Sequence, residues 1–339
     1  MHIKGATLDD LLRRVFDKAL KSQVRTRSSK GDARELMAVT LTLENPRARF
    51  SRTERRATLL TCLGETLWYF SGSKQLDVIE HYIPSYRSFS ELSRRAKTAP
   101  GAYGPRIFGG GDRSQLAGVI EHLRKKKDTR QAVIQIFDRK DLGKKDVPCT
   151  CTLQFMARGG RLHMVTAMRS NDAYRGLPHD VFAFTWLQEI VARSIAHEVG
   201  VYHHTVGSLH LYDDDEGRAR EFLAEGWQET MAMPPLPSGD PWPSVNWLLG
   251  IEASIRMGGS PSLDENGVDP YWVDLGRLLR IHTLLKTKNM REIVKEKNAM
   301  TSPVYDAFIR SKASVTEAIP DAPMLNLAGG AHEQKGRGG

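Results

Sequence analysis

The stretch VPCTCTLQFMARGGRLHMVTAMRSND, residues 147–172, is typical of two strands joined by a tight turn. Residues 150–157 and 161–168 are rich in apolar and β-branched types, and the ARGGR segment between them indicates a hairpin turn. Two of the three cysteines, Cys149 and Cys151, lie at the start of the first strand. Side chains two residues apart point to the same face, so strand alternation leaves open which cysteine is a nucleophile.

Outward from this hairpin, apolar periodicity and turn residues predict further helices and strands. The segment RTRSSKGDAR, residues 25–34, is polar and is expected to form a loop. Asp112 is expected to cap the helix that follows it. The expected helices cover residues 5–24, 55–72, 113–127, 180–200, 215–230 and 272–286, with more helix to residue 313, and the other expected strands cover 35–46, 130–137 and 201–212.

The composition is that of a chain with a substantial core, since 40% of its 339 residues are hydrophobic and 26% are charged. No apolar run approaches the ~20 residues of a membrane span. The cysteines are odd in number and too few for a disulfide framework, which favours a reducing, cytoplasmic location. The net charge of +9 suggests anionic partners. No basic stretch is interleaved with aromatic residues, so nucleic acid is not the expected partner.

A cysteine that attacks an electrophilic carbon needs thiolate character, and therefore nearby cations or hydrogen-bond donors. Arg27, Arg130 and Arg169 lie at polar, loop-like positions, and such a group of arginines also suits a phosphate. The segment MRSND, residues 168–172, places an arginine, a hydroxyl and a carboxylate at the end of a strand. The segment HLY, residues 210–212, turns two polar rings to one side of another strand. Each feature alone is weak evidence for a functional site, and the order of the features along the chain makes the evidence more specific.

In this order the features resemble the thymidylate synthase family over residues 25–230. The family motifs are PC-x4-QF, R-S-x-D-x-x-x-G-L-P and H-T-x-G-x-x-H-x-Y. The segments GETLWYFSG and AYGPR further resemble the family helix that carries the catalytic glutamate and the family tyrosine loop. The motifs read here as Pro148-Cys149 to Gln154-Phe155, Arg169-Ser170-Asn171-Asp172 through Gly176-Leu177-Pro178, and His204-Thr205 through Gly207 to His210 and Tyr212.

The resemblance implies an α+β fold, with a thymidylate synthase-like sheet, packed helices and a helical C-terminal extension. We expect residues 1–235 to form the catalytic domain and residues 236–325 to form a helical extension packed on it. Residues 326–339 are expected to form a disordered tail because they are rich in glycine and polar residues.

The resemblance also implies which cysteine reacts. The family nucleophile lies five residues before the motif glutamine, which identifies Cys149, and Cys151 falls on an ordinary core position of the strand. In the family the thiolate adds to C6 of a pyrimidine nucleotide, and C5 then attacks the methylene group of 5,10-methylenetetrahydrofolate. By the same resemblance Glu65 handles protons through water, as general acid and base, and Tyr103 belongs to the catalytic site.

The remaining family roles concern binding of a pyrimidine nucleoside monophosphate and of the folate. Arg169, Ser170 and Arg27 (or Arg25) are expected at the phosphate, His210 and Tyr212 at the sugar, and Asp172 at the folate. Arg130 matches the family arginines that reach the phosphate of the partner subunit, which implies a two-fold homodimer.

One departure from the family motif concerns the base. The family asparagine that reads uracil is replaced by Asp180. An ionised carboxylate only accepts hydrogen bonds, so it suits the 4-amino group of cytosine, whereas an amide matches the donor and acceptor of uracil. A mismatched buried polar pair costs about 1–3 kcal/mol. The substitution resembles that of the (deoxy)cytidylate 5-hydroxymethylases, although Asp180 would also suit a helix N-cap.

In those enzymes water captures the exocyclic methylene intermediate and the product carries a hydroxymethyl group. The family tryptophan that shields this intermediate has no counterpart in HYIPSYRSFSEL, residues 81–92, and Thr150 replaces the histidine that usually follows the cysteine. Both changes suit a hydrated pocket. Ser170 and Arg130 match the deoxynucleotide enzymes, which favours dCMP over CMP.

Three alternatives stay open on the sequence. A methyltransferase acting on dUMP or dCMP, as in thymidylate synthase proper, is opposed for dUMP by Asp180. A non-catalytic RNA-binding protein would use the basic surface, but would not need Cys149, Glu65 and Tyr103. A metal site at His203, His204 and His210 fits no closed zinc pattern, so no metal is expected.

Overall fold

The hairpin at residues 150–172 forms the middle of the sheet in the computed structural model, which describes residues 1–51, 58–110, 114–227, 230–263 and 267–313. Strand β5 (Thr150–Arg158) pairs antiparallel with β6 (Arg161–Asp172). Gly159 and Gly160 connect them with φ values of 54° and 73°. Two successive positive φ values define the turn that matches strand twist, which explains the glycine pair.

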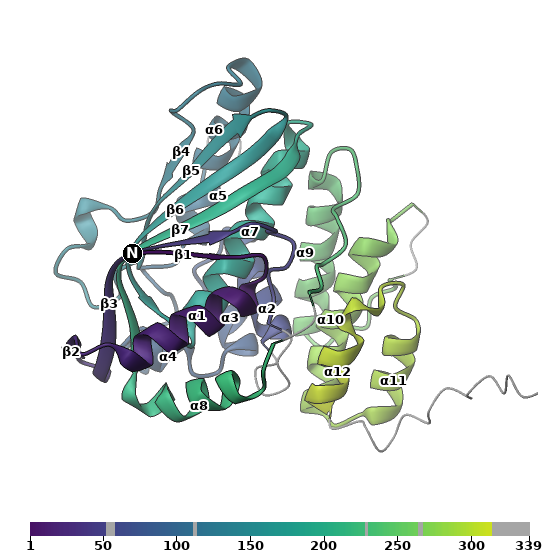
Figure 1. Ribbon diagram of the computed structural model, residues 1–339. Coiled ribbons are helices and arrows are strands. Elements are labelled where there is room, and N and C mark those ends of the chain that lie inside the picture. The colour runs from purple at the N-terminus through teal and green to yellow at the C-terminus, as the bar shows by residue number, and fades with distance from the viewer. Residues whose placement is uncertain (52–57, 111–113, 228–229, 264–266, 314–339) are drawn as a thin grey trace, which may run out of the picture.

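The sheet has seven strands in the order β1-β3-β7-β6-β5-β4, with β2 paired to β3. Strand β7 (Glu198–Tyr212) runs parallel to β6, and β1 (His2–Gly5) runs parallel to β3, whereas the other pairs are antiparallel. The α+β expectation is therefore confirmed as a mixed sheet with packed helices (Figure 1). Because β6 and β7 are parallel, their carboxyl ends meet at one edge.

The N-terminal region differs from the expectation. Residues 25–34 form a hairpin rather than a loop, because β2 (Arg25–Ser28) turns through Gly31 (φ 121°) into β3 (Gly31–Leu43). Backbone pairing with β7 holds this polar segment, and local sequence does not report such pairing. The helix expected over 5–24 is α1 (Leu8–Lys21), which begins at a capping box between Thr7 and Asp10.

Helix α7 (Gly176–Ser194) is buried along most of its length and packs against β6 and α2 (Leu59–Phe70). It begins four residues before the expected start at Asp180. Asp172 Oδ1 accepts hydrogen bonds from the backbone N–H groups of Tyr174 (2.8 Å) and Arg175 (2.9 Å) and so fixes the entry to the helix. Asp180 lies inside the helix, so the interpretation of Asp180 as an N-cap is wrong.

The remaining elements of the main body are short. Asp112, the expected cap of the next helix, lies outside the described residues, and Ser114 instead caps that helix by accepting from Ala117 N. The expected helix over 215–230 is α8, which begins at Asp213 and ends at Ala224. The short elements of the main body are α3 (Leu76–Tyr82), α4 (Tyr86–Phe89), α5 (Gly104–Phe108), α6 (Gln115–Lys125), β4 (Val133–Gln135), the 3-10 turn η3 (Arg139–Asp141) and α8 (Asp213–Ala224).

The described residues between 236 and 313 form helices joined by loops. Figure 1 shows these green-to-yellow helices gathered beside one end of the sheet. Their buried side chains join the same hydrophobic core as the sheet, and Trp186 of α7 donates to the hydroxyl of Tyr271 (2.9 Å). The elements are α9 (Trp242–Arg256), α10 (Pro270–Lys286), α11 (Met290–Asn298), η4 (Pro303–Tyr305) and α12 (Asp306–Ala313).

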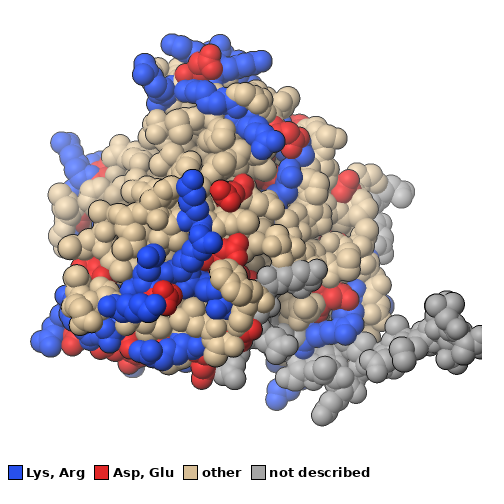
Figure 2. Space-filling model, in the orientation of Figure 1, with Lys and Arg blue, Asp and Glu red and all other residues tan. Residues whose placement is uncertain are grey.

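The boundary at residues 235–236 stays a prediction, and the tail expected at 326–339 lies outside the described residues. The surface mixes charges of both signs on the visible face, with lysines and arginines most crowded near α6 (Figure 2). In the part of the chain that the structure describes, no helix is long and apolar enough to cross a bilayer.

Candidate active site

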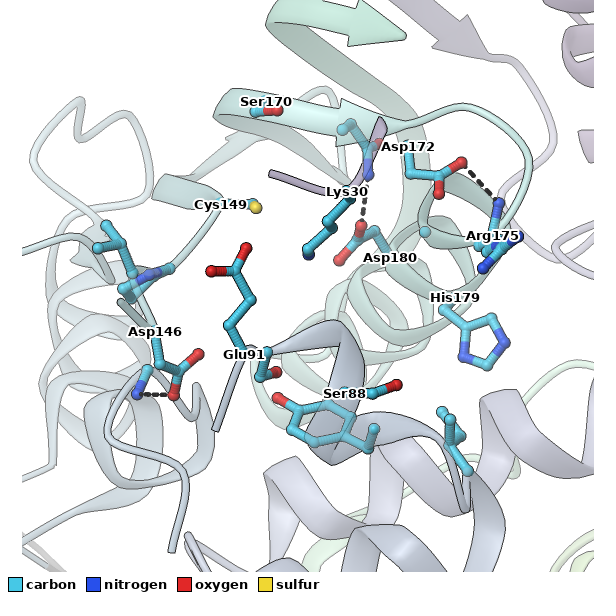
Figure 3. A pocket seen from close by; sticks show the side chains of 18 of the residues that line it. Lys30, Ser88, Glu91, Asp146, Cys149, Ser170, Asp172, Arg175, His179 and Asp180 are labelled. Atoms are coloured by element: carbon cyan, nitrogen blue, oxygen red, sulfur yellow. Dashed lines mark hydrogen bonds between the residues drawn. The ribbon is translucent and has the colours of Figure 1, made fainter. Parts of the chain in front are cut away.

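A cavity of about 810 Å³ opens at the edge where β6 and β7 end and β5 begins. Helices α2 and α7 and the turn between β2 and β3 supply its other walls (Figure 3). A cavity of this size suits a small-molecule ligand. The residues expected in the site that line it are Glu65, Tyr103, Cys149, Arg169, Ser170, Asp172, Asp180, His210 and Tyr212.

Cys149 lies on the connection that leads into β5, and its thiol borders the cavity. Arg169, on β6, has its Nη2 3.7 Å from the sulfur. Burial raises the pKa of the Cys149 thiol, the guanidinium of Arg169 opposes this, and the carboxyl group of Asp180 adds to it. A thiol beside a guanidinium in a cavity is the arrangement that a cysteine nucleophile requires.

Cys151 does not line this cavity and is half-buried rather than in the core. The pairing of β5 with β6 shifts register between Thr150 and Thr152, so the simple alternation expected of the two cysteines is broken. The carbonyl oxygen of Cys151 accepts from the N–H groups of Ile136 (2.9 Å) and Phe137 (3.2 Å). The structure thus separates the environments of two cysteines that the sequence left equivalent.

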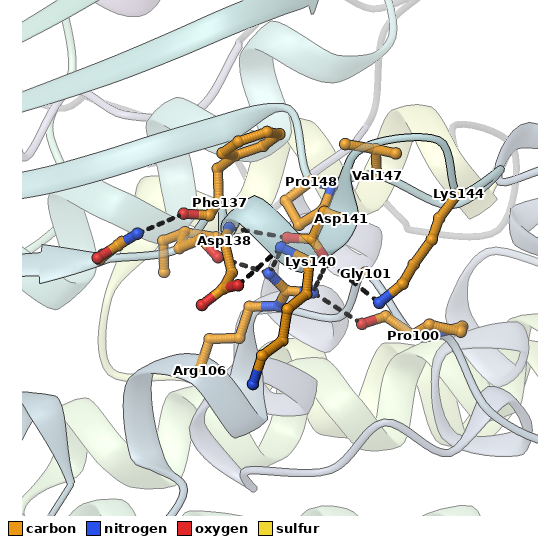
Figure 4. Close-up of polar contacts among 12 residues, drawn as sticks. Pro100, Gly101, Arg106, Phe137, Asp138, Lys140, Asp141, Lys144, Val147 and Pro148 are labelled. Carbon is orange, nitrogen blue, oxygen red and sulfur yellow. Dashed lines mark hydrogen bonds and ion pairs between the residues drawn. The ribbon is translucent and has the colours of Figure 1, made fainter.

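The connection before Cys149 is held by one arginine–carboxylate pair, shown in Figure 4. Arg106 of α5 donates to Asp141 Oδ2 (2.5 Å) and Oδ1 (2.8 Å), and to the carbonyl oxygen of Ile136 (2.6 Å). The guanidinium lowers the pKa of Asp141 to about 2. Two parallel hydrogen bonds fix orientation as well as distance, so α5 and the segment leading to Cys149 are joined firmly.

Glu65 and His179 face each other across the cavity wall formed by α2 and α7. His179 Nδ1 lies 2.5 Å from Glu65 Oε2, and the hydroxyl of Tyr69 donates to Glu65 Oε1 (2.7 Å). Burial lowers the pKa of His179, but the neighbouring Cys62 and Glu65 outweigh burial and raise it well above its usual value. This pairing was not predicted from the sequence.

Asp180 occupies the inner wall of the cavity and belongs to a buried polar chain. Asn171 Nδ2 donates to Asp180 Oδ2 (2.8 Å), and Asn171 Oδ1 lies 2.9 Å from His204 Nε2. Burial and the charge of Glu65 raise the pKa of Asp180 to about 8, so its carboxyl group holds a proton at neutral pH. Burial lowers the pKa of His204 to about 3, so this imidazole is neutral and donates from Nε2 to the amide oxygen.

The aromatic and polar walls complete the cavity. The Tyr103 hydroxyl accepts from Thr150 N (3.3 Å), and its ring stacks on Phe184 with centroids 6.1 Å apart. The rings of His210 and Tyr212 line the cavity together, 4.9 Å apart, as the spacing of HLY predicts. These contacts hold the tyrosine and histidine rings at the mouth of the cavity.

Arg27 and Arg130 do not line the cavity in this single chain. Arg27 is exposed and pairs with Asp32 (3.0 Å), and Arg25 pairs with Asp213 (2.5 Å). Arg130 is exposed, and its carbonyl oxygen accepts from the side chain of Gln154. The expected phosphate roles of Arg27 and Arg130 therefore stay predictions.

Lys30 instead carries a positive charge from the β2–β3 turn into the cavity. Figure 3 shows its side chain extending between Cys149 and Asp180, and its charge lowers the pKa of Cys149. Lys30 was not predicted as a site residue, because the segment that contains it was expected to be a loop. His179 and Asn171 adjoin motif residues, but their partners on α2 and β7 are far away in sequence.

The segment 81–92, in which the sequence lacks a tryptophan, forms part of the cavity wall. Ile83, Pro84 and Tyr86 contribute apolar surface, and Ser88, Ser90 and Glu91 contribute polar groups. Among the residues that the structure describes, no three His, Cys, Asp or Glu side chains are grouped as metal ligands. The cavity lining includes a thiol, carboxyl groups, imidazoles and the cationic side chains of Lys30 and Arg169.

Comparison with known proteins agrees with this arrangement. A family model described as "Thymidylate synthase" matches residues 7–236. A protein of Pseudomonas phage M6 named "Deoxyuridylate hydroxymethyltransferase" is 33% identical over 166 residues, which are 48% of this chain and 46% of that protein. The chain thus spans about half the length of this relative. Because the family model covers more than half of the chain, the protein belongs to the thymidylate synthase family.

Proposed function

We propose that this chain transfers a one-carbon unit from 5,10-methylenetetrahydrofolate to C5 of a pyrimidine nucleoside monophosphate. The observation that carries the proposal is a thiol 3.7 Å from a guanidinium, in a cavity that also holds Glu65 and Asp180. This combination offers a nucleophile, a base and a group that can read the pyrimidine ring. Family membership supports the same chemistry.

The reaction would proceed through a covalent adduct. The Cys149 thiolate adds to C6, and the electron pair displaced to C5 forms a bond to the methylene carbon of the co-substrate. Loss of the C5 proton and cleavage of the carbon–nitrogen bond leave an exocyclic methylene group on the ring. The folate leaves as tetrahydrofolate, whose two added protons are balanced by the proton lost from C5 and by the proton that the added water later releases through Glu65 to solvent, so no oxidation occurs.

We propose that water rather than hydride captures this methylene group. Addition of water forms the carbon–oxygen bond, and the electron pair returned through C5 expels the thiolate from C6. The polar groups of Ser88, Ser90 and Glu91 on the cavity wall support a hydrated pocket. Thr150 is fully buried and does not line the cavity, so it adds no support. The product would be a 5-hydroxymethyl pyrimidine nucleotide.

Cytidylate is our proposed substrate, with dCMP ahead of CMP. Asp180 lies on the inner wall, where Asn171 fixes its Oδ2 as an acceptor. With its proton, the carboxyl group can donate to N3 of cytosine and accept from the 4-amino group, and without the proton an ionised carboxylate would repel the O4 of uracil. Arg169 and Ser170 are proposed at the phosphate, His210 and Tyr212 at the sugar, Asp172 at the folate, and Arg130 at the phosphate of a partner subunit in a homodimer.

Uridylate is a second candidate because of one observation. The buried carboxyl group of Asp180 has a pKa of about 8, so it carries a proton that O4 of uracil can accept. The name of the phage relative, a deoxyuridylate hydroxymethyltransferase, points the same way. A protonated Asp180 would therefore allow dUMP at neutral pH.

One incubation tests these proposals. The protein is mixed with 5,10-methylenetetrahydrofolate and an equal mixture of dCMP, CMP, dUMP and UMP, and the products are identified by mass. We expect dCMP to gain the mass of a hydroxymethyl group. A methyl product would mean a methyltransferase, and no product with any nucleotide would leave the RNA-binding alternative, which a filter-binding titration at physiological salt would measure.

A further inference from the structure

The carboxylate of Glu65 has both of its oxygen atoms engaged by donors. His179 Nδ1 lies 2.5 Å from Oε2, and the hydroxyl of Tyr69 donates to Oε1 across 2.7 Å. A carboxylate that accepts from two sides favours its ionised form. The side chains of Glu65 and His179 are 13% and 15% exposed, so they are largely desolvated but still reachable from the cavity.

The hydrogen bonds around His179 indicate which of its ring nitrogens carry protons. The single proton of the Thr61 hydroxyl is used on the carbonyl oxygen of Thr58 (2.8 Å). The hydroxyl oxygen therefore accepts from His179 Nε2, 3.3 Å away. Nδ1 faces Glu65 Oε2, and the neighbouring Cys62 and Glu65 raise the pKa of His179 well above its usual value, so Nδ1 also holds a proton and donates. A ring that donates from both nitrogens is an imidazolium, so the pair is His179 positive and Glu65 negative.

The groups around this pair decide whether the charges can persist. Cys62 and Tyr69 face it from α2, Asp180 faces it from the next position of α7, and Tyr86 faces Glu65 from α4. Because Asp180 holds a proton at neutral pH, His179 and Glu65 are the charged partners on this part of the cavity wall. An imidazolium next to a buried carboxylate compensates the cost of desolvating it.

We propose that His179 is a positioning residue that keeps Glu65 ionised and aimed into the cavity, so that Glu65 takes the proton from the water that adds to the exocyclic methylene group. In this step an O–H bond of water breaks and its oxygen bonds to the methylene carbon. The proton goes to Glu65, and the electron pair passes through C5 and breaks the C6–S bond, which restores the thiolate. The inference rests on the proposed function and names the residue that sets the state of its base.

The first test is kinetic and uses His179→Gln and His179→Phe. Without the imidazolium, Glu65 Oε2 loses a hydrogen-bond donor and a neighbouring positive charge, so the pH profile of kcat in both variants should differ from that of the wild type. We expect kcat at pH 6.5 to fall about tenfold to a hundredfold, with less than about a threefold change in the KM for nucleotide. His197→Gln, which removes a histidine outside the cavity, is the matched control and should keep the wild-type profile.

The second test needs no turnover. Nitrogen-15 NMR of histidine-labelled, nucleotide-free protein at pH 8 should give one doubly protonated imidazole, and Glu65→Gln should abolish that signal. A neutral His179 at pH 8, or variant and wild-type pH profiles that coincide, would overturn the inference. If the wild type forms no hydroxymethyl product while the imidazolium is present, the proposed function has failed and the assignment of the ion pair stands.

Discussion

Arg169 lies with Nη2 3.7 Å from Cys149 Sγ while its guanidinium donates to the carbonyl oxygens of Pro148 (2.9 Å) and Val147 (2.9 Å). One side chain therefore holds the backbone that precedes the cysteine and brings a positive charge to the thiol. A lysine could supply the charge but not two donors in the fixed, planar arrangement of Nε and Nη2 that these carbonyl oxygens receive. The reactivity of the thiol and the shape of its connection depend on the same residue.

Removal of this guanidinium should make Cys149 a weaker nucleophile. We expect Arg169→Gln to raise the pKa of the thiol by about one unit, since an opposite charge at this distance favours the thiolate. The rate of iodoacetamide alkylation, followed at Cys149 by peptide mass mapping from pH 6 to pH 10, measures this shift. Arg158→Gln, on β5 outside the cavity, should leave the profile unchanged, and an identical profile in Arg169→Gln would contradict the role.

The two cysteines should differ sharply in function. Cys149→Ser should abolish turnover, because a serine hydroxyl does not ionise near neutral pH and cannot replace the thiolate. Cys151→Ser should keep most of the activity, since Cys151 lies outside the cavity. The measurement is product formation, together with trapping of a nucleotide adduct by mass. Equal loss in both variants would refute the assignment.

Most of the predicted site residues line the cavity, because they belong to motifs with fixed spacing. Arg169 and His210 lie near the carboxyl ends of the parallel strands β6 and β7, and Cys149 precedes the start of β5, which is antiparallel to β6, so all three meet at one end of the sheet. The pairing of His179 with Glu65 was not predictable in the same way. It depends on how α7 packs against α2, and 114 residues separate the two partners.

The same reason explains the errors in the fold. Residues 25–34 are polar and resemble a loop, but β2 pairs with the start of β3, which itself pairs with β7, so they form a hairpin that brings Lys30 to the cavity. The expected start of α7 at Asp180 was four residues late because Asp172, which looked like a ligand contact alone, also holds the turn before the helix by accepting from the N–H groups of Tyr174 and Arg175. Local sequence patterns do not show which strands will pair or which helices will pack together in the folded chain.

Asp180→Asn should change the preference for the base. The amide keeps a permanent donor, so we expect the ratio of dUMP to dCMP turnover to rise about fivefold or more, the effect of about 1 kcal/mol. In the wild type the same ratio should fall as the pH rises through about 8, because the carboxyl group loses its proton. A competition assay from pH 6.5 to pH 9 measures both effects, and ionisation of the thiol cancels in the ratio. A ratio that changes neither with pH nor with the substitution would mean that Asp180 does not read the ring.

Asp180→Asn should also alter the pH dependence of stability. In the unfolded chain this carboxyl group loses its proton near pH 4, whereas in the fold it keeps it to about pH 8. Between these values the native state binds one more proton, so this group lowers the free energy of unfolding by about 1.4 kcal/mol for each pH unit of increase. The variant lacks this term, and its melting temperature relative to the wild type should rise from pH 5 to pH 8. A constant difference across that range would contradict the raised pKa.

The buried carboxylate of Glu189 should be among the most sensitive positions of the fold. It pairs with Arg47 (2.8 Å) and Arg49 and accepts from the backbone N–H of Leu236 (3.1 Å), so it joins α7 to the segment that leads to the C-terminal helices. Arg49 is fully buried and Glu189 is 2% exposed, so Glu189→Ala would leave a buried guanidinium without its partner, at a cost of about 3–5 kcal/mol.

Glu198→Ala is the matched control for this position, because Glu198 pairs with the same Arg47 (3.2 Å) but is 58% exposed. Water screens such a pair, so its loss should cost less than about 1 kcal/mol. Chemical denaturation of both variants gives the two free energies of unfolding. Glu189 and Glu198 both pair with arginine and differ mainly in burial. A much larger loss of stability in Glu189→Ala would therefore assign the cost to a buried, unpaired charge. Equal free energies of unfolding in the two variants would show that the Arg47–Arg49–Glu189 cluster does not hold α7 to Leu236.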